Sequence, residues 1–115
     1  MSNEKGDIYY ADLGSGVGSE QTGLRPVIVF QNHQINQFTQ TVIIIPFTTN
    51  LKRLKIPSSV LISKGSGGLP EDSVALCHQI AVISLKRLRS YIGTLPDNLI
   101  KQMDEKLLFT LDISK

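Results

Sequence analysis

The loop in front of an apolar strand carries the residue types best suited to chemistry. The stretch Gly18–Val29, GSEQTGLRPVIV, places a hydroxyl (Ser19), a carboxylate (Glu20), an amide (Gln21) and a guanidinium (Arg25) within seven positions. A carboxylate can move protons, whereas a guanidinium stays charged and presents paired N–H groups to anions. Two interpretations follow: the loop is a solvated turn, or it is half of a functional site.

Positive charge is gathered in two short groups, although the chain of 115 residues has a formal net charge of only +2. One group is the segment LKRLK at 51–55, and the other is LKRLR at 85–89. Local groups of this kind permit a polyanionic partner. A solvated surface is the alternative for either group taken alone.

The cysteine, the histidines and the apolar runs exclude several classes of protein. The single cysteine, Cys77, can form neither an internal disulfide nor a cysteine-rich metal site, and we interpret it as a small core residue. Nothing in the sequence brings His33 and His78 together. No apolar run reaches the length of a membrane span, and no secretory leader begins the chain. We therefore expect a cytoplasmic protein without membrane contact.

Hydrophobic patterning predicts a β-rich chain that forms one domain over residues 1–115. Strands are expected at 8–13, 26–30, 41–47, 59–62, 72–82 and 90–93. The third, TVIIIPF, is so rich in β-branched residues that we expect a central buried strand, which Pro46 should end because proline cannot donate to a ladder. A turn or short helix is expected at 32–37, a hairpin-like loop at 64–68 and one helical turn at 84–89.

The period of the hydrophobic pattern changes near the C-terminus. Apolar residues recur every four positions at Leu99, Met103, Leu107 and Leu111, and Thr94–Asp97 has the form of a capping box with a proline near the first turn. The chain should therefore end in an amphipathic helix. Short strands followed by one helix predict a mainly β (β+α) fold, a small, strongly bent antiparallel sheet or partial barrel with a C-terminal α-helix packed on it.

Several segments together resemble the MazF/PemK (Kid) family of toxins from toxin–antitoxin systems. GDIYYADL at 6–13 is followed by GSEQTGLRPVIVFQN at 18–32 and TVIIIPFTTN at 41–50, and EDSVALCHQI at 71–80 matches the family's later strand. The resemblance covers most of the chain, while the C-terminal helix fits only by type. It implies the small SH3-like fold shared by MazF, PemK and CcdB.

The resemblance also implies a function. Family members are sequence-selective, metal-independent endoribonucleases that cleave single-stranded mRNA, inhibit translation and growth, and are neutralised by an antitoxin. The 2′-hydroxyl of the RNA is the nucleophile, giving 2′,3′-cyclic phosphate and 5′-hydroxyl ends, so no metal or cofactor is expected. A homodimer and a cognate antitoxin are the expected protein partners. The alternatives are an inactive RNA-binding relative and a non-cleaving, CcdB-like gyrase inhibitor, against which the absence of tryptophan argues.

By the same resemblance, Arg25 and Thr48 are the catalytic pair. Arg25 suits the stabilisation of charge on phosphorus, and the Thr48 hydroxyl can donate to the same phosphate. The family often assigns the acid–base work to this arginine as well, but a guanidinium keeps its proton near neutral pH and is a poor base. Glu20, His78 and Arg25 therefore stay open as candidates for the base. The structural alternatives are a surface pairing of Arg25 with Asp7 or Glu20, a strand-end cap at Thr48 and a loop-stabilising role for Glu20.

Three positions depart from the family pattern. His78 stands where relatives carry an acidic residue, Leu76 replaces an arginine of the Kid type, and Ala81 replaces another arginine. These departures bear on the base, the sequence preference and the pH optimum. A histidine on an alternating strand is also commonly a partly buried structural residue, which is the alternative for His78.

The expected RNA contacts surround the catalytic pair. Lys52 and Arg53 follow Thr48 closely and can screen phosphates, unless the segment is simply a mobile exposed loop. Bases of single-stranded RNA are read by stacking and by hydrogen bonds to their edges. The candidates for RNA binding besides the two basic residues are Ser19, Gln21, Asn32, Ser73, His78 and Gln79.

Overall fold

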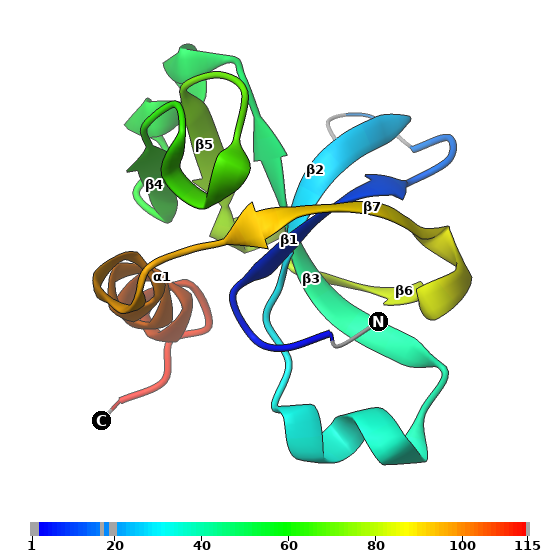
Figure 1. Cartoon of the computed structure of the whole chain (residues 1–115). Coiled ribbons are helices and arrows are strands. Elements are labelled where there is room, and N and C mark those ends of the chain that lie inside the picture. Colours follow the sequence, from blue (N-terminus) through cyan, green and yellow to red (C-terminus); the bar gives the residue numbers. More distant parts are fainter. Residues whose placement is uncertain (1–2, 17, 19–20, 115) are drawn as a thin grey trace.

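A computed structural model describes residues 3–16, 18 and 21–114 of the chain (Figure 1). These residues form seven strands and one α-helix. The strands are β1 (Asp7–Asp12), β2 (Leu24–Val29), β3 (Thr41–Thr48), β4 (Ser59–Ile62), β5 (Ser73–Leu76), β6 (Ala81–Ser84) and β7 (Leu88–Thr94), and the helix is α1 (Asp97–Thr110). Short 3-10 turns lie between them: η1 (His33–Phe38), η2 (Leu51–Lys55), η3 (Ser66–Gly68), η4 (Cys77–Gln79) and η5 (Leu85–Arg87).

All strand pairs are antiparallel, and β3 is the centre of the sheet. One path runs in the order β4-β5-β3-β2-β1-β7, while β6 pairs with β3 away from that path. One edge of β3 is therefore shared, because Thr41–Ile44 pairs with β6 and Phe47–Thr48 pairs with β5. The sheet bends strongly but does not close, as the described residues show no pairing between β6 and β7. The expected fold, a mainly β, strongly bent antiparallel sheet with a C-terminal helix, is confirmed.

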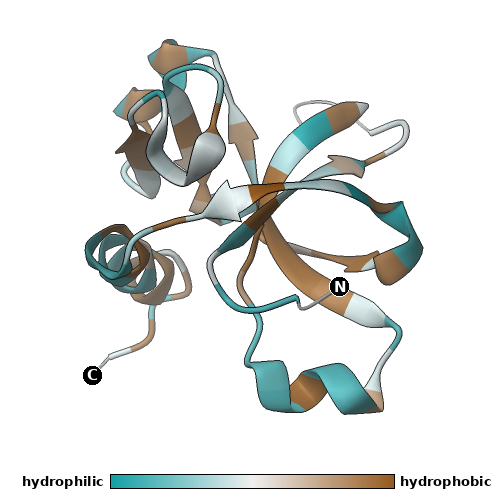
Figure 2. Ribbon diagram, in the orientation of Figure 1, coloured by the Kyte–Doolittle hydropathy of each residue, from teal (hydrophilic) through white to brown (hydrophobic). Residues whose placement is uncertain are grey.

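Two apolar cores lie on the two faces of the bent sheet. Alternate residues of a strand point to opposite faces, so Ile28, Ile45 and Phe47 join the core that α1 covers, with Met103 from the helix. Val27, Val29 and Ile44 join the other core, to which Tyr9 and Leu88 also belong. The central strands and the inner side of α1 are the most hydrophobic parts of the ribbon (Figure 2).

The long strand predicted at 72–82 is wrong. This segment divides into β5, the turn η4 and β6, because the chain leaves one half of β3 and joins the other half. His78 therefore lies on a turn and not on an alternating strand. The final strand is longer than predicted, starting at Leu88, and the helical turn before it is confined to Leu85–Arg87.

Pro46 does not end β3, which continues to Thr48. The Ile43 carbonyl accepts from the Phe30 amide, so the backbone groups of Ile45 and Phe47 also point toward β2. The nitrogen of Pro46 then points to the opposite edge, in the gap where the neighbour of β3 changes from β6 to β5. No ladder donor is needed there, and the proline is tolerated.

The capping box predicted at Thr94–Asp97 is also wrong. Helix α1 starts at Asp97 after Pro96, and no side chain caps it. Thr94 is the last residue of β7, and its hydroxyl instead donates to Asp7 Oδ1 at 2.8 Å. The predicted amphipathic helix itself is confirmed, with Met103 buried and Leu99 and Leu107 packed against the first core.

Candidate active site

Arg25 and Thr48 lie on neighbouring strands. Val27 is opposite Pro46 in the last pair of the β2–β3 ladder, so Arg25 and Thr48 lie two residues beyond this pair on their own strands. Because side chains alternate along a strand, Arg25 points to the same face of β2 as Val27, and Thr48 to the same face of β3 as Pro46. The start of β2 and the end of β3 lie at the same end of the molecule, away from η1 (Figure 1). The fold thus brings together two residues separated by 23 positions of sequence.

The Arg25 guanidinium is half-buried and is oriented by the backbone. Its Nε donates to the Thr22 carbonyl at 2.6 Å. Among the described residues no carboxylate lies within ion-pair distance of Arg25. Asp7, one suggested partner, accepts from Thr94 and from the Glu4 amide instead. The alternative of an Arg25–Asp7 pair is therefore wrong, and the positive charge of Arg25 is uncompensated by Asp7.

Thr48 links the end of β3 to the first basic segment. Its side chain is 8% exposed, and Oγ1 accepts from the Asn50 amide at 3.2 Å. Since the hydroxyl accepts this bond, its hydrogen is left to donate elsewhere. Asn50 in turn caps η2 by accepting from the Lys52 amide at 3.2 Å. Thr48 is thus a strand-end cap, and this role leaves its donor free.

The basic segment after Thr48 has a defined conformation. Lys52 and Lys55 are exposed on η2 while Arg53 is half-buried. The Arg53 carbonyl accepts from the Ser59 hydroxyl at 2.8 Å, which fixes the turn against the start of β4. The segment is an exposed, cationic 3-10 turn, with its first lysine four residues beyond Thr48.

A polar cleft of about 450 Å³ opens beside the two strands, on the face away from α1. Its floor contains Ile44 and Pro46 of β3. The remaining lining residues that the structure describes are Leu13, Gln21, His78, Gln79, Ile80, Ala81, Val82, Ile83 and Arg87. The cleft thus lies between the loop that precedes β2 and the segment from η4 to β6. Pro46 lies opposite Val27, two residues from Arg25 along β2.

Gln21 and Gln79 join the two walls of this cleft. The Gln21 amide donates to Gln79 Oε1 at 3.1 Å. In the part of the chain that the structure describes, the buried Oε1 of Gln21 has no hydrogen-bond partner. A buried acceptor without a partner costs free energy, so this atom favours a ligand that presents an N–H or O–H group.

His78 lies at one end of the cleft. Its imidazole is exposed, and Nδ1 lies 3.4 Å from the hydroxyl of Ser58, which is buried. Ser58 was not anticipated from the sequence, since a serine after a proline carries no pattern of its own. This contact engages one ring nitrogen, while the imidazole also lines the cleft.

Other predicted positions lie elsewhere. Asn32 follows the far end of β2, roughly 20 Å along the strand from Arg25 at about 3.3 Å per residue, and it caps η1. Ser73 is 2% exposed, and its hydroxyl donates to the Glu71 carbonyl. Neither position adjoins the Arg25–Thr48 pair with a free side chain, so we leave both out of the proposed site. Ser19 and Glu20 lie outside the described residues.

No second reactive centre emerges among the described residues. No group of three or more metal-ligating side chains is found there, and no helix is long and apolar enough to cross a bilayer. Cys77 is fully buried, and burial raises the pKa of its thiol to about 11. A thiol with this pKa is protonated near neutral pH and is a poor nucleophile, which fits its predicted place in the core.

Comparison with known proteins gives a consistent result. Residues 4–111 match the family model described as PemK-like, MazF-like toxin of type II toxin–antitoxin systems. The chain is 41% identical to Endoribonuclease EndoA of Bacillus subtilis over 111 residues, covering 96% of both chains. Solved structures share the fold, including MazF from Deinococcus radiodurans, with a TM-score of 0.80, 21% identity and 96% of both chains covered. A mycobacterial endoribonuclease in complex with its cognate antitoxin has a TM-score of 0.78 at 22% identity, again with 96% of both chains covered.

Proposed function

Because the chain belongs to the PemK-like, MazF-like toxin family, we propose that it is an endoribonuclease toxin that cleaves single-stranded mRNA at selected sequences and thereby inhibits translation and growth. The observation that supports this proposal is that Arg25 and Thr48 lie at the same end of two paired strands, two residues beyond the Val27–Pro46 pair. Arg25 is a cation without a carboxylate partner among the described residues, Thr48 has a hydroxyl donor, and Pro46 beside them lines a polar cleft.

The proposed reaction is a metal-independent transesterification. The 2′-oxygen of the RNA attacks the adjacent phosphorus, the bond from phosphorus to the 5′-oxygen breaks, and the products carry a 2′,3′-cyclic phosphate and a 5′-hydroxyl. The proton of the 2′-hydroxyl passes to a base, and the leaving 5′-oxygen takes up a proton. The protein supplies no nucleophile. Its task is to stabilise the negative charge that builds on the phosphate oxygens and to move two protons.

Arg25 and Thr48 divide the first of these tasks. The Nε of Arg25 is held by the Thr22 carbonyl, so its terminal N–H groups are the ones that face a phosphate. Paired N–H donors match two phosphate oxygens. Thr48 adds one hydroxyl donor from the neighbouring strand. Donors fixed before the reaction begins cost no reorganisation in the transition state.

The base is left to Glu20 or His78. Glu20 is in the loop directly before Gln21, although it lies outside the described residues. His78 is on the cleft wall with its Nδ1 against Ser58, and imidazole titrates in the useful pH range. His78 serves as an RNA contact in either case, because it is exposed at one end of the cleft.

The cleft is the proposed site of base selection. Gln21, Gln79 and His78 offer hydrogen-bonding edges over an apolar floor of Ile44 and Pro46, an arrangement suited to an unstacked base read on its edge. Lys52 and Arg53 on η2 would hold the backbone on the other side of Thr48. Ser19 is a further candidate for edge reading.

A homodimer and an antitoxin are the proposed partners in the cytoplasm. Related MazF and endoribonuclease structures were solved as complexes with an antitoxin. On this chain, Phe38, Phe109, Leu111 and Ile113 are exposed apolar residues. Three of these residues belong to the C-terminal end of α1 or follow it, beside a groove lined by Phe30, Leu107 and Leu108. We expect a second copy of the chain to cover part of this apolar surface.

The proposal is tested by incubating the purified protein with a long single-stranded RNA in EDTA, beside Arg25→Ala and a fully duplex RNA of the same sequence. We expect discrete cuts with 2′,3′-cyclic phosphate ends in the single strand alone. Loss of the charge-stabilising guanidinium should lower kcat/KM by roughly 10²- to 10³-fold or more. Intact RNA with the unmodified protein, or equal cutting by Arg25→Ala, would contradict the proposal.

A further inference from the structure

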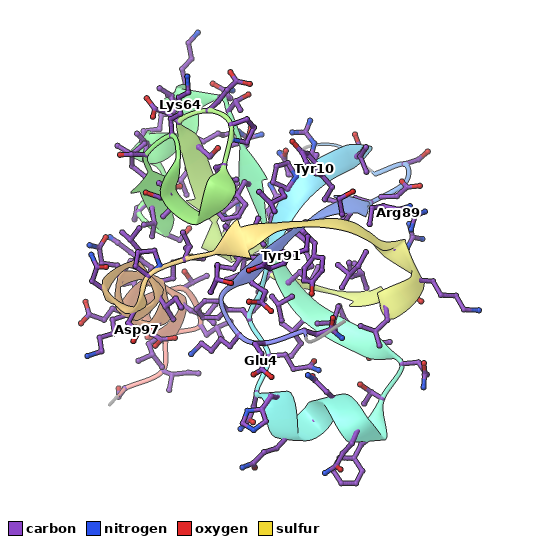
Figure 3. All side chains as sticks on the ribbon, viewed as in Figure 1. Glu4, Tyr10, Lys64, Arg89, Tyr91 and Asp97 are labelled. Carbon is purple, nitrogen blue, oxygen red and sulfur yellow. The ribbon has the colours of Figure 1, made fainter. Side chains whose placement is uncertain are left out.

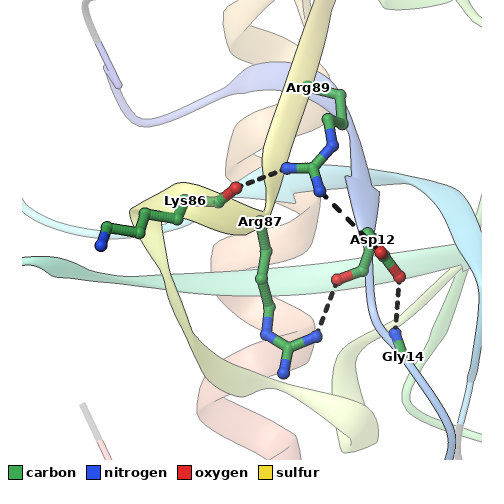
Figure 4. Close-up of polar contacts among 5 residues, drawn as sticks. All are labelled: Asp12, Gly14, Lys86, Arg87 and Arg89. Carbon is green, nitrogen blue, oxygen red and sulfur yellow. Dashed lines mark hydrogen bonds and ion pairs between the residues drawn. The ribbon is translucent and has the colours of Figure 1, made fainter.

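The second basic group lies against the end of β1. Lys86 and Arg87 belong to η5, and Arg89 is near the start of β7. Arg87 and Arg89 lie beside Asp12, whereas the Lys86 side chain points away from it (Figure 4). The Arg89 guanidinium donates a hydrogen bond to the Lys86 carbonyl, and its Nη2 forms an ion pair with Asp12 Oδ2 at 3.9 Å. Of the three cations, only Arg87 lines the cleft that also holds Gln21 and His78.

Arg87 is close to a carboxylate but does not pair with it. Its Nη1 donates to the backbone carbonyl of Asp12 at 3.1 Å. The carboxylate of Asp12 instead accepts from the Gly14 amide at 2.9 Å and faces Arg89. Among the described residues, no acidic side chain lies within 4.0 Å of the Arg87 guanidinium. Its positive charge is therefore uncompensated at the mouth of a polar cleft.

The guanidinium is also fixed relative to the loop that carries Gln21. Gly14 and Gly23 form the stem of this loop through a backbone bond of 2.9 Å. Arg87 packs directly on the stem, since a Cβ added at Gly14 would lie 3.2 Å from Nη1. A glycine at position 14 thus allows the close approach. One N–H group of the Arg87 guanidinium donates to the Asp12 carbonyl, and its other N–H groups have no partner among the described residues.

We propose that Arg87 binds a backbone phosphate of the substrate RNA at the Leu13 end of the cleft, beyond the base that the cleft would select. This inference rests on the proposed function and extends it. A guanidinium with free paired donors is suited to phosphate oxygens, and Lys86 beside it raises the local positive potential. The RNA then runs from η2 past Arg25 and Thr48, through the cleft, to η5.

Arg87 is a binding residue in this scheme, remote from the proton transfers. The competing explanation is that it only fastens the loop stem to Asp12. Arg87→Gln separates the two roles, because a neutral amide can still donate to the Asp12 carbonyl but carries no charge for a phosphate. Arg87→Lys keeps the charge and loses the paired donors.

Lys101→Gln is the matched control. It removes the same charge from an exposed position on α1, and α1, which begins at Asp97, lies on the other side of the molecule from Arg89 (Figure 3). Thermal melting of each variant establishes that it is folded before RNA is added.

The experiment measures binding and cleavage separately over a range of salt concentrations. Binding uses a fluorescent RNA that contains the cut sequence with a single 2′-deoxy residue at the cut, and cleavage uses the all-ribose RNA at saturation. For Arg87→Gln we expect about tenfold weaker binding, as for the loss of one charged hydrogen-bonding contact, with kcat within about twofold. The slope of log Kd against log salt should become shallower by about 0.7. Arg87→Lys should restore the slope, and Lys101→Gln should match the unmodified protein.

Unchanged affinity and salt slope in Arg87→Gln would overturn the inference, as would a fall in kcat at unchanged affinity. The two proposals fail separately. An unmodified protein that binds the single-stranded RNA but leaves its all-ribose form intact contradicts the proposed function, while the Arg87 comparison in binding still decides the phosphate contact.

Discussion

The two faces of β3 differ although they are built from alternate residues of one strand. On the face toward α1, Ile45 and Phe47 are at most 1% exposed and meet Met103 of the helix. On the other face Ile44 is equally buried, in the second core, but Ile44 and Pro46 also line a polar cleft, and Thr48 is the last residue of this row. The face toward α1 is thus closed, whereas the other face is open only where it borders the cleft. Apolar packing on both sides fixes the strand, and the residues beside the cleft are thereby held in place.

The first prediction concerns the closed face. Phe47→Ala should lower the free energy of unfolding by about 3–5 kcal/mol, since it removes a fully buried ring and leaves a cavity. Urea unfolding followed by circular dichroism measures the change. The fraction of protein that stays folded should cut RNA at an unchanged rate per folded molecule.

The control for this prediction is Leu61→Ala on β4, where the side chain is 46% exposed. It should change the free energy of unfolding by about 0.5 kcal/mol or less. A Phe47→Ala protein that is as stable as the unmodified one, or one that stays fully folded and loses cleavage, would contradict the division between the two faces.

The second prediction concerns the open face. Thr48→Val keeps the shape of the side chain and removes the hydroxyl, so the single-turnover cleavage rate should fall by about 10²-fold, as for the loss of one fixed donor to a developing oxyanion. The Asn50 amide also loses its acceptor, which should cost about 1 kcal/mol of stability. Rates are measured by quenched reactions with excess enzyme.

Thr48→Ser is the matched control for the hydroxyl, and it should recover most of the lost rate. If Thr48→Val cleaves within about threefold of the unmodified protein, Thr48 serves only as the strand-end cap, and its free hydroxyl donor has no part in the reaction.

The third and smallest effect is in the buried thiol. Burial raises the pKa of Cys77 to about 11, so above pH 9 the unfolded chain loses this proton before the folded chain does. The folded state then binds more protons, and the free energy of unfolding should fall as pH rises from about 9 to 11, by at most about 1.4 kcal/mol per pH unit. Urea unfolding of Cys77→Ala beside the unmodified protein isolates this contribution; identical pH dependence in both would contradict it.

The sequence was sufficient to predict the class of fold and the strands that bear the two proposed catalytic residues. Local patterns carried this much: the β-branched run at 41–47 is a strand, the fourfold spacing after Asp97 is a helix, and the motifs around Arg25 and Thr48 fall on adjoining strand ends. Nothing in the chain's own periodicity predicted the register between β2 and β3, and the choice of Arg25 and Thr48 as a pair came from the family resemblance.

The errors arose where tertiary contacts override local pattern. We predicted one strand at 72–82 because no local pattern marks the break at η4. The break arises from a tertiary contact, since β5 pairs with one half of β3 and β6 with the other half. Thr94 resembled a cap, but its register beside Asp7 offered the hydroxyl a carboxylate. Arg87 looked like any residue of a basic group, and its place in the cleft depends on how the chain between β6 and β7 meets Asp12.

The most direct test of the central claim is cleavage of two RNA oligonucleotides in EDTA that differ by one oxygen, the 2′-hydroxyl at the mapped cut. We expect the unmodified protein to cut the all-ribose strand and leave a 2′,3′-cyclic phosphate end. The 2′-deoxy strand should bind equally well and stay intact. Arg25→Ala should bind both strands but cut the all-ribose strand far more slowly than the unmodified protein does. Cutting of the 2′-deoxy strand at the same position would show that the protein or a water molecule supplies the nucleophile, and it would contradict transesterification by the 2′-hydroxyl.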